Sequence, residues 1–375
     1  MTRALHCYSG NLYGGVEMLL ATLARSRDLC PAMESHFALC FEGRLSAELA
    51  AASAPLHLIG NVRVRRPLTV WRARRRFSEL LRRTRFDLIV CHSPWSQAIF
   101  GPVVRLAGLP LVFWLHDAIS GRHWLERWAS LTPPDLALCC SEYTAGKLTN
   151  VYPNVPAELI HHPVALAKSR HSTVDRVSLR KELDTPKDAI VIVQVSRMER
   201  WKGHSLHLQA LSLLKDLPDW VSWQVGGAQR PHELRYLEAL KKQAARLGIA
   251  SRVRFLGERS DVPRLLAAAD IHCQPNLSAE PFGITFVEAL MAGLPVVTAA
   301  FGGAKEIVDD SCGILVPPGD ARALAASLRR LIGDRNLRTR LGAAGPMRAH
   351  KLCDSATQMS RLNELFNRAV NAARR

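Results

Sequence analysis

Short apolar runs that alternate with longer helical segments are the feature of this sequence that most constrains its fold. Asp87–Cys91, Leu111–Leu115 and Leu136–Cys140 are nearly continuous apolar runs. Runs of this length between helices are typical of parallel strands that are buried on both faces. Intervening segments such as Val16–Ser26 repeat their apolar residues at helical spacing. The first half of the chain is therefore expected to form a doubly wound α/β domain.

The same alternation starts again after an interruption in the middle of the chain. Residues 166–187 show little periodicity over most of their length and are expected to form a linker. Ala189–Ser196 is then a strand candidate rich in Ile and Val, and strands and helices alternate again up to residue 350. Two such arrays predict two Rossmann-like domains, residues 1–165 and 188–350, that face each other across a cleft.

Composition excludes several other classes of protein. Hydrophobic residues make up 48% of the chain and charged residues 22%, which is typical of globular proteins and not of disordered ones. No apolar run reaches the roughly 18 residues that a membrane span needs, and the N-terminus has no signal-peptide pattern. The nine cysteines show no C-x-x-C spacing, so they are expected to be buried free thiols in a cytoplasmic protein.

Positive charge is concentrated in one part of the chain. The net charge is +17, and the segment from Asn61 to Phe86 holds ten arginines and one acid, Glu79. Within it, Pro67–Arg83 is expected to be a helix with one apolar face. Six arginines of that helix are expected to be largely exposed: Arg72, Arg74, Arg75, Arg76, Arg82 and Arg83. Such a block indicates an anionic partner, namely nucleic acid, an anionic membrane or a phosphorylated substrate, or else a solvated face.

One motif combines a helix start with two carboxylates. The segment EPFGITFVE begins at Glu280 and ends at Glu288, and its helix is expected to start near Gly283 or Ile284. The backbone N–H groups of Phe282, Gly283 and Ile284 would lie at that helix start, where anions bind. The two carboxylates are at most about 12 Å apart, so one can bind sugar hydroxyls and the other ribose hydroxyls. On the residues alone, a helix-terminal charge and an exposed glutamate remain the simpler interpretation.

Three further segments place polar or small residues where strands end. Arg197 and Lys202 follow Ala189–Ser196 and can offset phosphate charge, although a solvated pair remains an alternative. His116 ends an apolar strand and is either a structural histidine or a site residue. Gly14-Gly15 opens a helix and permits close approach of the backbone to a ligand. The spacing is not G-x-G-x-x-G, so no nicotinamide cofactor is expected.

The motif from Glu280, E-P-F-G-x-x-x-x-E-A-x-x-x-G-x-P-V-V, resembles the hallmark of retaining glycosyltransferases of family 4. The segment from Val195 to His204 is similar to the family's strand-end segment, and Tyr13–Glu17 is similar to its G-G-x-E loop. Leu115–Asp117 resembles the family's histidine loop. This resemblance implies the GT-B fold of two Rossmann-like domains, with a final helix, residues 351–375, that packs back on the first domain.

The resemblance also assigns roles to the candidate residues. It implies that Arg197 and Lys202 hold the donor diphosphate and that Gly14 and Gly15 approach the donor. Two catalytic positions follow from the same resemblance: His116 beside the transferred sugar, and Glu280 in contact with it. Glu288, with Phe282, Gly283 and Ile284 at the helix start, would complete the donor site. No D-x-D motif is present, so no metal and no cofactor are expected.

The leading hypothesis is a retaining, metal-independent hexosyltransferase. It would move a hexose from a UDP- or GDP-linked sugar to a hydroxyl of a glycan or lipid-linked glycan, as in polysaccharide biosynthesis. A nucleotide-sugar epimerase of the same fold is the alternative enzyme. A basic nucleic-acid-binding protein is the alternative of another class, but the arginine segment has no interleaved stacking aromatics, so no nucleic acid is expected.

The arginine segment Arg63–Arg85 suggests where the enzyme works. Several exposed arginines can hold a protein reversibly at an anionic leaflet, where lipid-linked acceptors are found. No apolar face of the segment is expected to be free for insertion, so attachment would be electrostatic and sensitive to salt. The enzyme is therefore expected to be cytoplasmic and peripheral at the inner face of the membrane.

Overall fold

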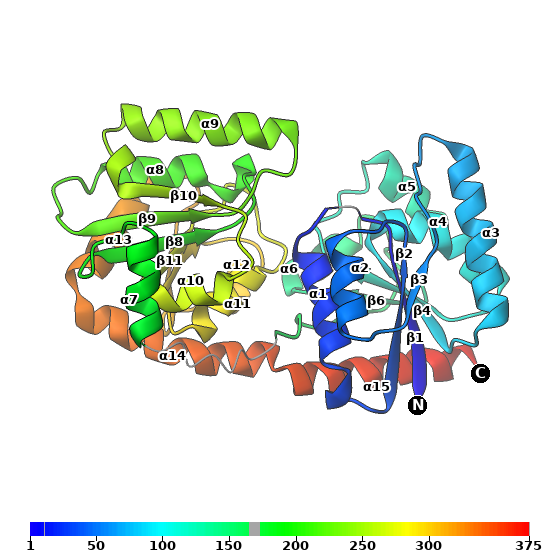
Figure 1. Ribbon diagram of the computed structural model, residues 1–375. Coiled ribbons are helices and arrows are strands. Elements are labelled where there is room, and N and C mark those ends of the chain that lie inside the picture. Colours follow the sequence, from blue (N-terminus) through cyan, green and yellow to red (C-terminus); the bar gives the residue numbers. More distant parts are fainter. Residues whose placement is uncertain (11, 165–172, 375) are drawn as a thin grey trace. The chain divides into compact units, whose positions relative to one another are not determined.

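The chain forms two α/β units, each built around one parallel sheet (Figure 1). The computed structural model describes residues 1–10, 12–164 and 173–374. Unit 1 comprises Met1–Ala165 together with Cys353–Arg375, and unit 2 comprises Leu166–Leu352. The predicted pair of doubly wound domains is therefore confirmed.

The sheet of unit 1 has the strand order β3-β2-β1-β4-β5-β6-β7, and every neighbouring pair is parallel. Its strands are β1 (Thr2–Tyr8), β2 (Met33–Leu39), β3 (Leu56–Leu58), β4 (Leu88–His92), β5 (Leu111–Leu115), β6 (Leu136–Cys139) and β7 (Ala157–Leu159). Side chains alternate between two cores, as β1 shows: Ala4 and Tyr8 lie in one, Leu5 and Cys7 in the other. The chain order reverses between β1 and β4, and ligands of such sheets bind beside that reversal.

Helices cover both faces of this sheet. They are α1 (Gly15–Arg25), α2 (Arg44–Ala51), α3 (Pro67–Arg83), α4 (Ser93–Leu106), α5 (Trp124–Ser130), α6 (Glu142–Leu148) and α15 (Ser355–Ala373), with a 3₁₀ turn at Arg27–Leu29. The apolar residues of α1, α2 and α15 belong to one core, and those of α3 and α4 to the other. This arrangement is the doubly wound one that the alternating sequence predicts.

The last helix, α15, packs on unit 1. Leu362, Leu365 and Phe366 are buried in the same core as Ala4 of β1, and Figure 1 shows α15 beside that strand. The apolar residues recur at helical spacing, so one stripe of α15 faces the sheet. The predicted return of the chain's end to the first domain is confirmed.

One arginine of the basic helix α3 is less exposed than predicted. Arg74 is half-buried and donates hydrogen bonds to the carbonyls of Ala98 and Ile99 at 2.9 Å. Pro102 lies inside α4 and has no N–H to give to the carbonyl of Ala98, four residues earlier. Arg74 supplies that missing donor, so it stabilises the packing of α3 on α4 and is not a free surface charge.

Unit 2 repeats the same topology, with the order β10-β9-β8-β11-β12-β13. Its strands are β8 (Ile190–Val195), β9 (Trp220–Val225), β10 (Val253–Gly257), β11 (Ile271–Gln274), β12 (Val296–Ala299) and β13 (Gly313–Val316). Its helices are α7 (Thr173–Glu182), α8 (His204–Ser212), α9 (Pro231–Arg246), α10 (Val262–Ala268), α11 (Ile284–Met291), α12 (Ala304–Ile307), α13 (Ala321–Gly333) and α14 (Arg335–Cys353), with 3₁₀ turns at Arg200–Lys202 and Ala250–Arg252. The chain order reverses between β8 and β11, which defines the ligand-binding edge of this unit.

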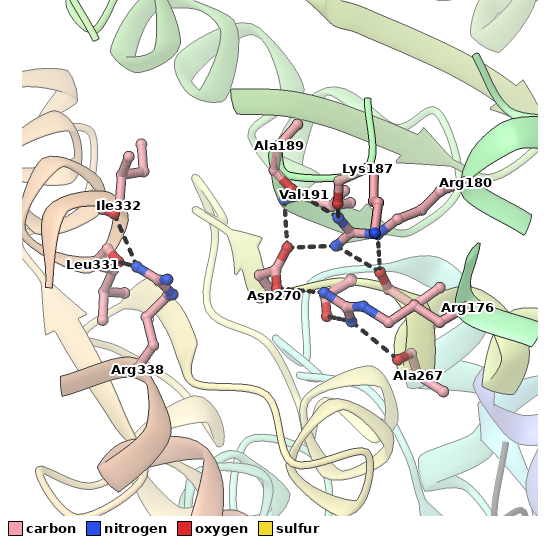
Figure 2. Close-up of polar contacts among 12 residues, drawn as sticks. Arg176, Arg180, Lys187, Ala189, Val191, Ala267, Asp270, Leu331, Ile332 and Arg338 are labelled. Atoms are coloured by element: carbon pink, nitrogen blue, oxygen red, sulfur yellow. Dashed lines mark hydrogen bonds and ion pairs between the residues drawn. The ribbon is translucent and has the colours of Figure 1, made fainter. Parts of the chain in front are cut away.

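The segment expected to be a linker contains a helix of unit 2. Residues 166–172 lie outside the described residues, whereas 173–182 form α7. Arg176 and Arg180 of α7 each donate to Asp270 at 2.6 Å, and Asp270 also accepts from the backbone N–H of Val191 in β8 (Figure 2). Further carbonyl acceptors of the two arginines are Lys187, Ala189, Ala267, Ala268 and Ala269. These bonds fix α7 to the sheet of unit 2.

Two simpler features complete the fold. All nine cysteines are buried and none forms a disulfide. Among residues 1–10, 12–164 and 173–374, no helix combines the length and the hydrophobicity that crossing a membrane requires.

Candidate active site

The reversal point of the unit 2 sheet brings together residues that lie about 80 positions apart in sequence. Arg197 and Lys202 follow the carboxyl end of β8, and Glu280 follows the carboxyl end of β11. Gly203 makes this approach possible, because it has a φ of +76° and its Cα lies against the carbonyl of Pro275. A Cβ at this position would come within 1.9 Å of that oxygen. The two loops therefore meet only because residue 203 is glycine.

Lys202 and Glu280 form an ion pair at this point. The Nζ of Lys202 lies 2.7 Å from Oε2 of Glu280, and both side chains are largely buried. The side-chain amides of Asn276 and Gln274 donate to the same oxygen, at 2.7 Å and 3.4 Å. A buried carboxylate with a cation and two amide donors is held in a fixed position. The prediction that Lys202 and Glu280 belong to one site agrees with this geometry.

The helix after Glu280 starts where the sequence predicts. α11 begins at Ile284, and its N-cap residue Gly283 has a φ of +104°. A Cβ on Gly283 would lie 2.4 Å from the ring of Phe286, so no other residue fits this turn. The first N–H groups of α11 have no acceptor within the helix, which gives its start a partial positive charge. Phe282, next to this turn in the chain, is buried.

Sequence reasoning missed part of the support for Glu280. Gly303 donates its backbone N–H to the carbonyl of Glu280 at 2.7 Å, and Gly302 forms a parallel bridge with Glu280. A Cβ on Gly302 would lie 2.6 Å from the Glu280 carbonyl oxygen, and one on Gly303 would lie 2.5 Å from that of Pro281. The adjacent Gly-Gly was the signal that two backbones approach closely here.

Glu288 is not the exposed helix residue that the simpler interpretation suggests. It lies one turn into α11 and is half-buried, and burial raises the pKa of its carboxyl group to about 7. Among the described residues its carboxylate has no hydrogen-bond or ion-pair partner. A partly desolvated carboxyl group without an internal partner is well suited to bind a ligand hydroxyl.

Arg197 and the glycine loop of unit 1 both have partners inside the protein. Arg197 pairs with Glu199 at 3.0 Å. In unit 1, the backbone N–H of Gly14 donates to Glu17 at 2.8 Å, and Glu17 also accepts from the hydroxyl of Tyr8. Glu17 therefore caps α1, and the N–H of Gly14 is already used within the loop.

His116 lies at the carboxyl end of β5, as predicted, but its surroundings are unexpected. Its Nε2 is 2.9 Å from Nδ1 of His92, and its Nδ1 is 3.2 Å from Nε2 of His162. Burial holds the pKa of His116 well below its usual range, so the ring is neutral. Because both ring nitrogens are engaged, His116 can offer a nitrogen to a ligand only by giving up one of these bonds.

Comparison with known proteins shows the family of the chain. Family models described as Glycosyltransferase Family 4 and Glycosyl transferases group 1 match residues 13–168 and 175–348. A GDP-mannose-dependent monoacylated alpha-(1-6)-phosphatidylinositol monomannoside mannosyltransferase of Corynebacterium glutamicum is 30% identical over 297 residues, which are 73% of this chain and 74% of that protein. The chain belongs to glycosyltransferase family 4. The family membership expected from the Glu280 motif is confirmed.

Other relatives of this family 4 glycosyltransferase cover different shares of the chain. The lipopolysaccharide core biosynthesis glycosyltransferase LpsE of Rhizobium meliloti is 33% identical over 167 residues, which are 44% of this chain and 46% of LpsE. The match thus spans about half the length of LpsE. The structure of Alr3699/HepE of Anabaena in complex with UDP-glucose is 26% identical, with a TM-score of 0.86 over 98% of this chain and all of that one. It has the GT-B fold predicted for this chain.

Proposed function

We propose that this glycosyltransferase moves a hexose from a nucleoside diphosphate sugar to an acceptor hydroxyl with retention of the anomeric configuration. The Lys202–Glu280 pair at the start of α11 is the observation that carries this proposal. A cation and a helix N-terminus favour the diphosphate, while the carboxylate beside them favours sugar hydroxyls. All three lie at the edge of the unit 2 sheet where ligands of such sheets bind.

Each candidate residue receives a separate role. Arg197 and Lys202 hold the diphosphate, Glu280 contacts the transferred sugar, and Glu288 binds the ribose. Phe282, Gly283 and Ile284 shape the helix start that faces the phosphates. Gly14, Gly15 and His116 lie in unit 1, and their roles beside the donor rest on the family resemblance alone.

The leaving diphosphate gains negative charge as the bond to the sugar breaks. Arg197, Lys202 and the N-terminus of α11 stabilise that charge, which is the main contribution that fixed charges make to such a transfer. No D-x-D motif is present to place a metal ion beside the phosphates, so we propose metal-independent transfer. A front-face substitution, in which the leaving phosphate accepts the proton of the acceptor hydroxyl, accounts for retention without a nucleophilic side chain.

Both UDP and GDP donors are found among the relatives. HepE is described in complex with UDP-glucose, and the protein of Corynebacterium glutamicum is described as dependent on GDP-mannose. We therefore propose a UDP- or GDP-linked hexose as the donor for this chain. The relatives named for lipopolysaccharide and phosphatidylinositol mannoside synthesis support a glycan or lipid-linked acceptor.

A screen of UDP-, GDP- and ADP-linked sugars for thermal stabilisation tests the donor. The cognate donor at 100 times its Kd is expected to add about 2.7 kcal/mol to the stability of the folded state. Glu288→Gln is expected to reduce this stabilisation, because it weakens the ribose contact. Donor turnover to an altered sugar without any acceptor would contradict transfer and support the epimerase. If the melting temperature with every one of these sugars equals that of the protein without any sugar, the proposed donor site is contradicted.

The basic helix α3 supports a membrane-bound acceptor, with one correction to the prediction. Leu68 is 68% exposed, Trp71 is 57% exposed, and Leu106 of the neighbouring helix α4 is 90% exposed. Leu68 and Trp71 belong to the arginine segment, so the expectation that no apolar face of this segment is free for insertion needs correction. Between α3 and α4 lies a groove of about 810 Å³, whose lining includes Trp71, Leu106, Arg82 and Arg83. We propose that this surface binds an anionic leaflet through charge and shallow apolar insertion.

Vesicle cosedimentation tests this surface. Binding to vesicles with anionic lipid is expected to fall with salt and to weaken in a variant with Arg72, Arg82 and Arg83 changed to Gln, because each exposed arginine contributes about 1 kcal/mol. Within the described part of the chain, the exposed side chains of these three arginines make no hydrogen bond or ion pair. A variant with Arg330, Arg335 and Arg340 changed to Gln is the control, since it loses the same charge from exposed positions of unit 2. Equal weakening in both variants, or equal binding to neutral vesicles, would contradict the proposal.

A further inference from the structure

Side chains of the loop after β8 are linked to one another through Trp201. Glu199 has contacts on both sides: its Oε1 is 3.0 Å from Nη2 of Arg197, and its Oε2 accepts a hydrogen bond from Nε1 of Trp201 at 2.9 Å. The Glu199 side chain is only 16% exposed, so water and salt screen these contacts little. One carboxylate therefore links the guanidinium of Arg197 to the indole of Trp201.

The same tryptophan lies against the second cation of the loop. Nζ of Lys202 is 3.8 Å from the centre of the Trp201 ring, which is within the range of a cation–π interaction. On its other side, Nζ is 2.7 Å from Oε2 of Glu280. A lysine ammonium has three N–H groups, so the ring and the carboxylate hold it in place and still leave an N–H for a ligand.

Backbone hydrogen bonds fix this tryptophan between the two loops of the site. The carbonyl of Trp201 accepts from the backbone N–H of Leu277 at 2.7 Å, and Leu277 lies between β11 and Glu280. The next carbonyl, that of Lys202, accepts from Nε2 of the buried Gln194 at 2.8 Å. The backbone and the indole N–H of Trp201 both have partners, so the orientation of its ring is fixed at both ends.

The Trp201 ring is not one of the tryptophans that fill the interior of unit 2. Trp220 and Trp223 are almost completely buried, as structural tryptophans are expected to be. Trp201 is half-buried and does not belong to the apolar core that the described residues of this unit form. Its side-chain contacts are instead with charged groups of the candidate site, which points to a role in that site.

We propose that Trp201 is a positioning residue that arranges two cations before the donor binds: Arg197 through Glu199, and Lys202 through the face of its own ring. This inference rests on the proposed function, in which both cations hold the donor diphosphate. Arg197 keeps donors for the phosphates, because its guanidinium has five N–H groups and, among the described residues, Glu199 as its one partner. Cations that are already in place need no reorganisation when the diphosphate arrives.

Binding of UDP and GDP to the full-length protein tests this role without any acceptor. Trp201→Leu removes both the ring and the indole N–H, so its affinity for the nucleoside diphosphate that the wild type binds is expected to fall roughly tenfold. Affinity for the corresponding nucleoside monophosphate should fall less, because that ligand lacks the second phosphate. Trp124→Leu is the control and should bind as the wild type does, since Trp124 is 53% exposed on unit 1. Isothermal titration calorimetry measures these affinities.

Double variants show through which cation the tryptophan acts. Trp201→Phe keeps a ring and loses only the N–H to Glu199, so it should weaken diphosphate binding less than Trp201→Leu does. In an Arg197→Ala background, Trp201→Phe should cause no further loss, because it acts through that arginine. The difference between phenylalanine and leucine should disappear in a Lys202→Ala background, because no ammonium is left to contact the ring. A merely structural tryptophan would lower the affinity by the same factor in every background.

The outcomes separate this inference from the proposed function. If Trp201→Leu binds the nucleoside diphosphate as tightly as the wild type, the positioning role is overturned and the proposed donor site stands. Equal losses for monophosphate and diphosphate, or the same loss in every background, overturn the positioning role as well. If Trp201→Leu does not fold, Trp201→Phe with and without Arg197→Ala decides. A wild-type protein that binds neither UDP nor GDP would contradict the proposed function, and the positioning role would fail with it.

Discussion

Replacing Lys202 by alanine is expected to lower kcat/KM roughly 100- to 1,000-fold, the loss seen when one fixed donor to a developing negative charge is removed. Lys202 lies 2.7 Å from Glu280 in a largely buried site, so its loss has two effects. The leaving diphosphate loses a nearby cation, and Glu280 becomes a buried carboxylate held only by Asn276 and Gln274. Steady-state kinetics with the donor found by the thermal screen measure the loss.

Glu280→Gln distinguishes the two roles in this pair. It is expected to lower kcat more than it changes KM, because the sugar contact matters most as the sugar departs. The double variant Lys202→Ala/Glu280→Gln should lose much less kcat/KM than the losses of the two single variants combined, since the two side chains are in direct contact. Arg200→Ala is the matched control, because Arg200 is an exposed cation of the same loop. Wild-type kcat/KM in Lys202→Ala, together with unchanged nucleoside diphosphate affinity, would place the donor site elsewhere.

The sequence predicts those parts of the fold and of the site that depend on the residues close by in the chain. α3 has the bounds predicted for it and α11 starts where predicted, because each has a clear apolar face and a proline or glycine at its start. The positions of Arg197 and Glu280 at one sheet edge follow from parallel topology, which puts the carboxyl ends of β8 and β11 side by side. β7 could not be predicted, since its three residues are exposed or half-buried and give no apolar run.

Other parts depend on contacts between distant segments. The contact of His116 with His92 requires the register that pairs His92 of β4 with Trp114 of β5, and no local pattern encodes that register. The half-buried position of Arg74 depends on Pro102 in the next helix, and only the packed structure shows that a carbonyl there lacks its donor. The residues whose environment was predicted least well are thus polar groups with partners far away in sequence.

Lowering the pH from 7 to 5.5 is expected to destabilise the fold strongly. Seven buried histidines of the described residues have pKa values lowered by burial from the ordinary 6.5, five of them to about 3: His6, His92, His116, His162, His204, His207 and His272. Between pH 6.5 and about 3 the unfolded chain binds more protons than the folded one, so the free energy of unfolding falls as the pH falls.

The expected size follows from the same linkage. Each buried histidine costs about 1.4 kcal/mol per pH unit below its ordinary pKa, so the seven together approach 10 kcal/mol at about pH 5.5. That is comparable to the whole stability of a domain, roughly 5–15 kcal/mol. Thermal melting followed by circular dichroism between pH 8 and 5 measures this loss.

His272→Leu identifies the cause. Neither ring nitrogen of His272 has a hydrogen-bond partner among the described residues, so leucine removes a protonation site without breaking a bond. The melting temperature of this variant is expected to fall less steeply below pH 6.5 than that of the wild type. His232→Leu, at an exposed position of the same unit, should leave the slope unchanged. Identical slopes in the wild type and His272→Leu would show that carboxylates, and not buried histidines, set the acid limit of this fold.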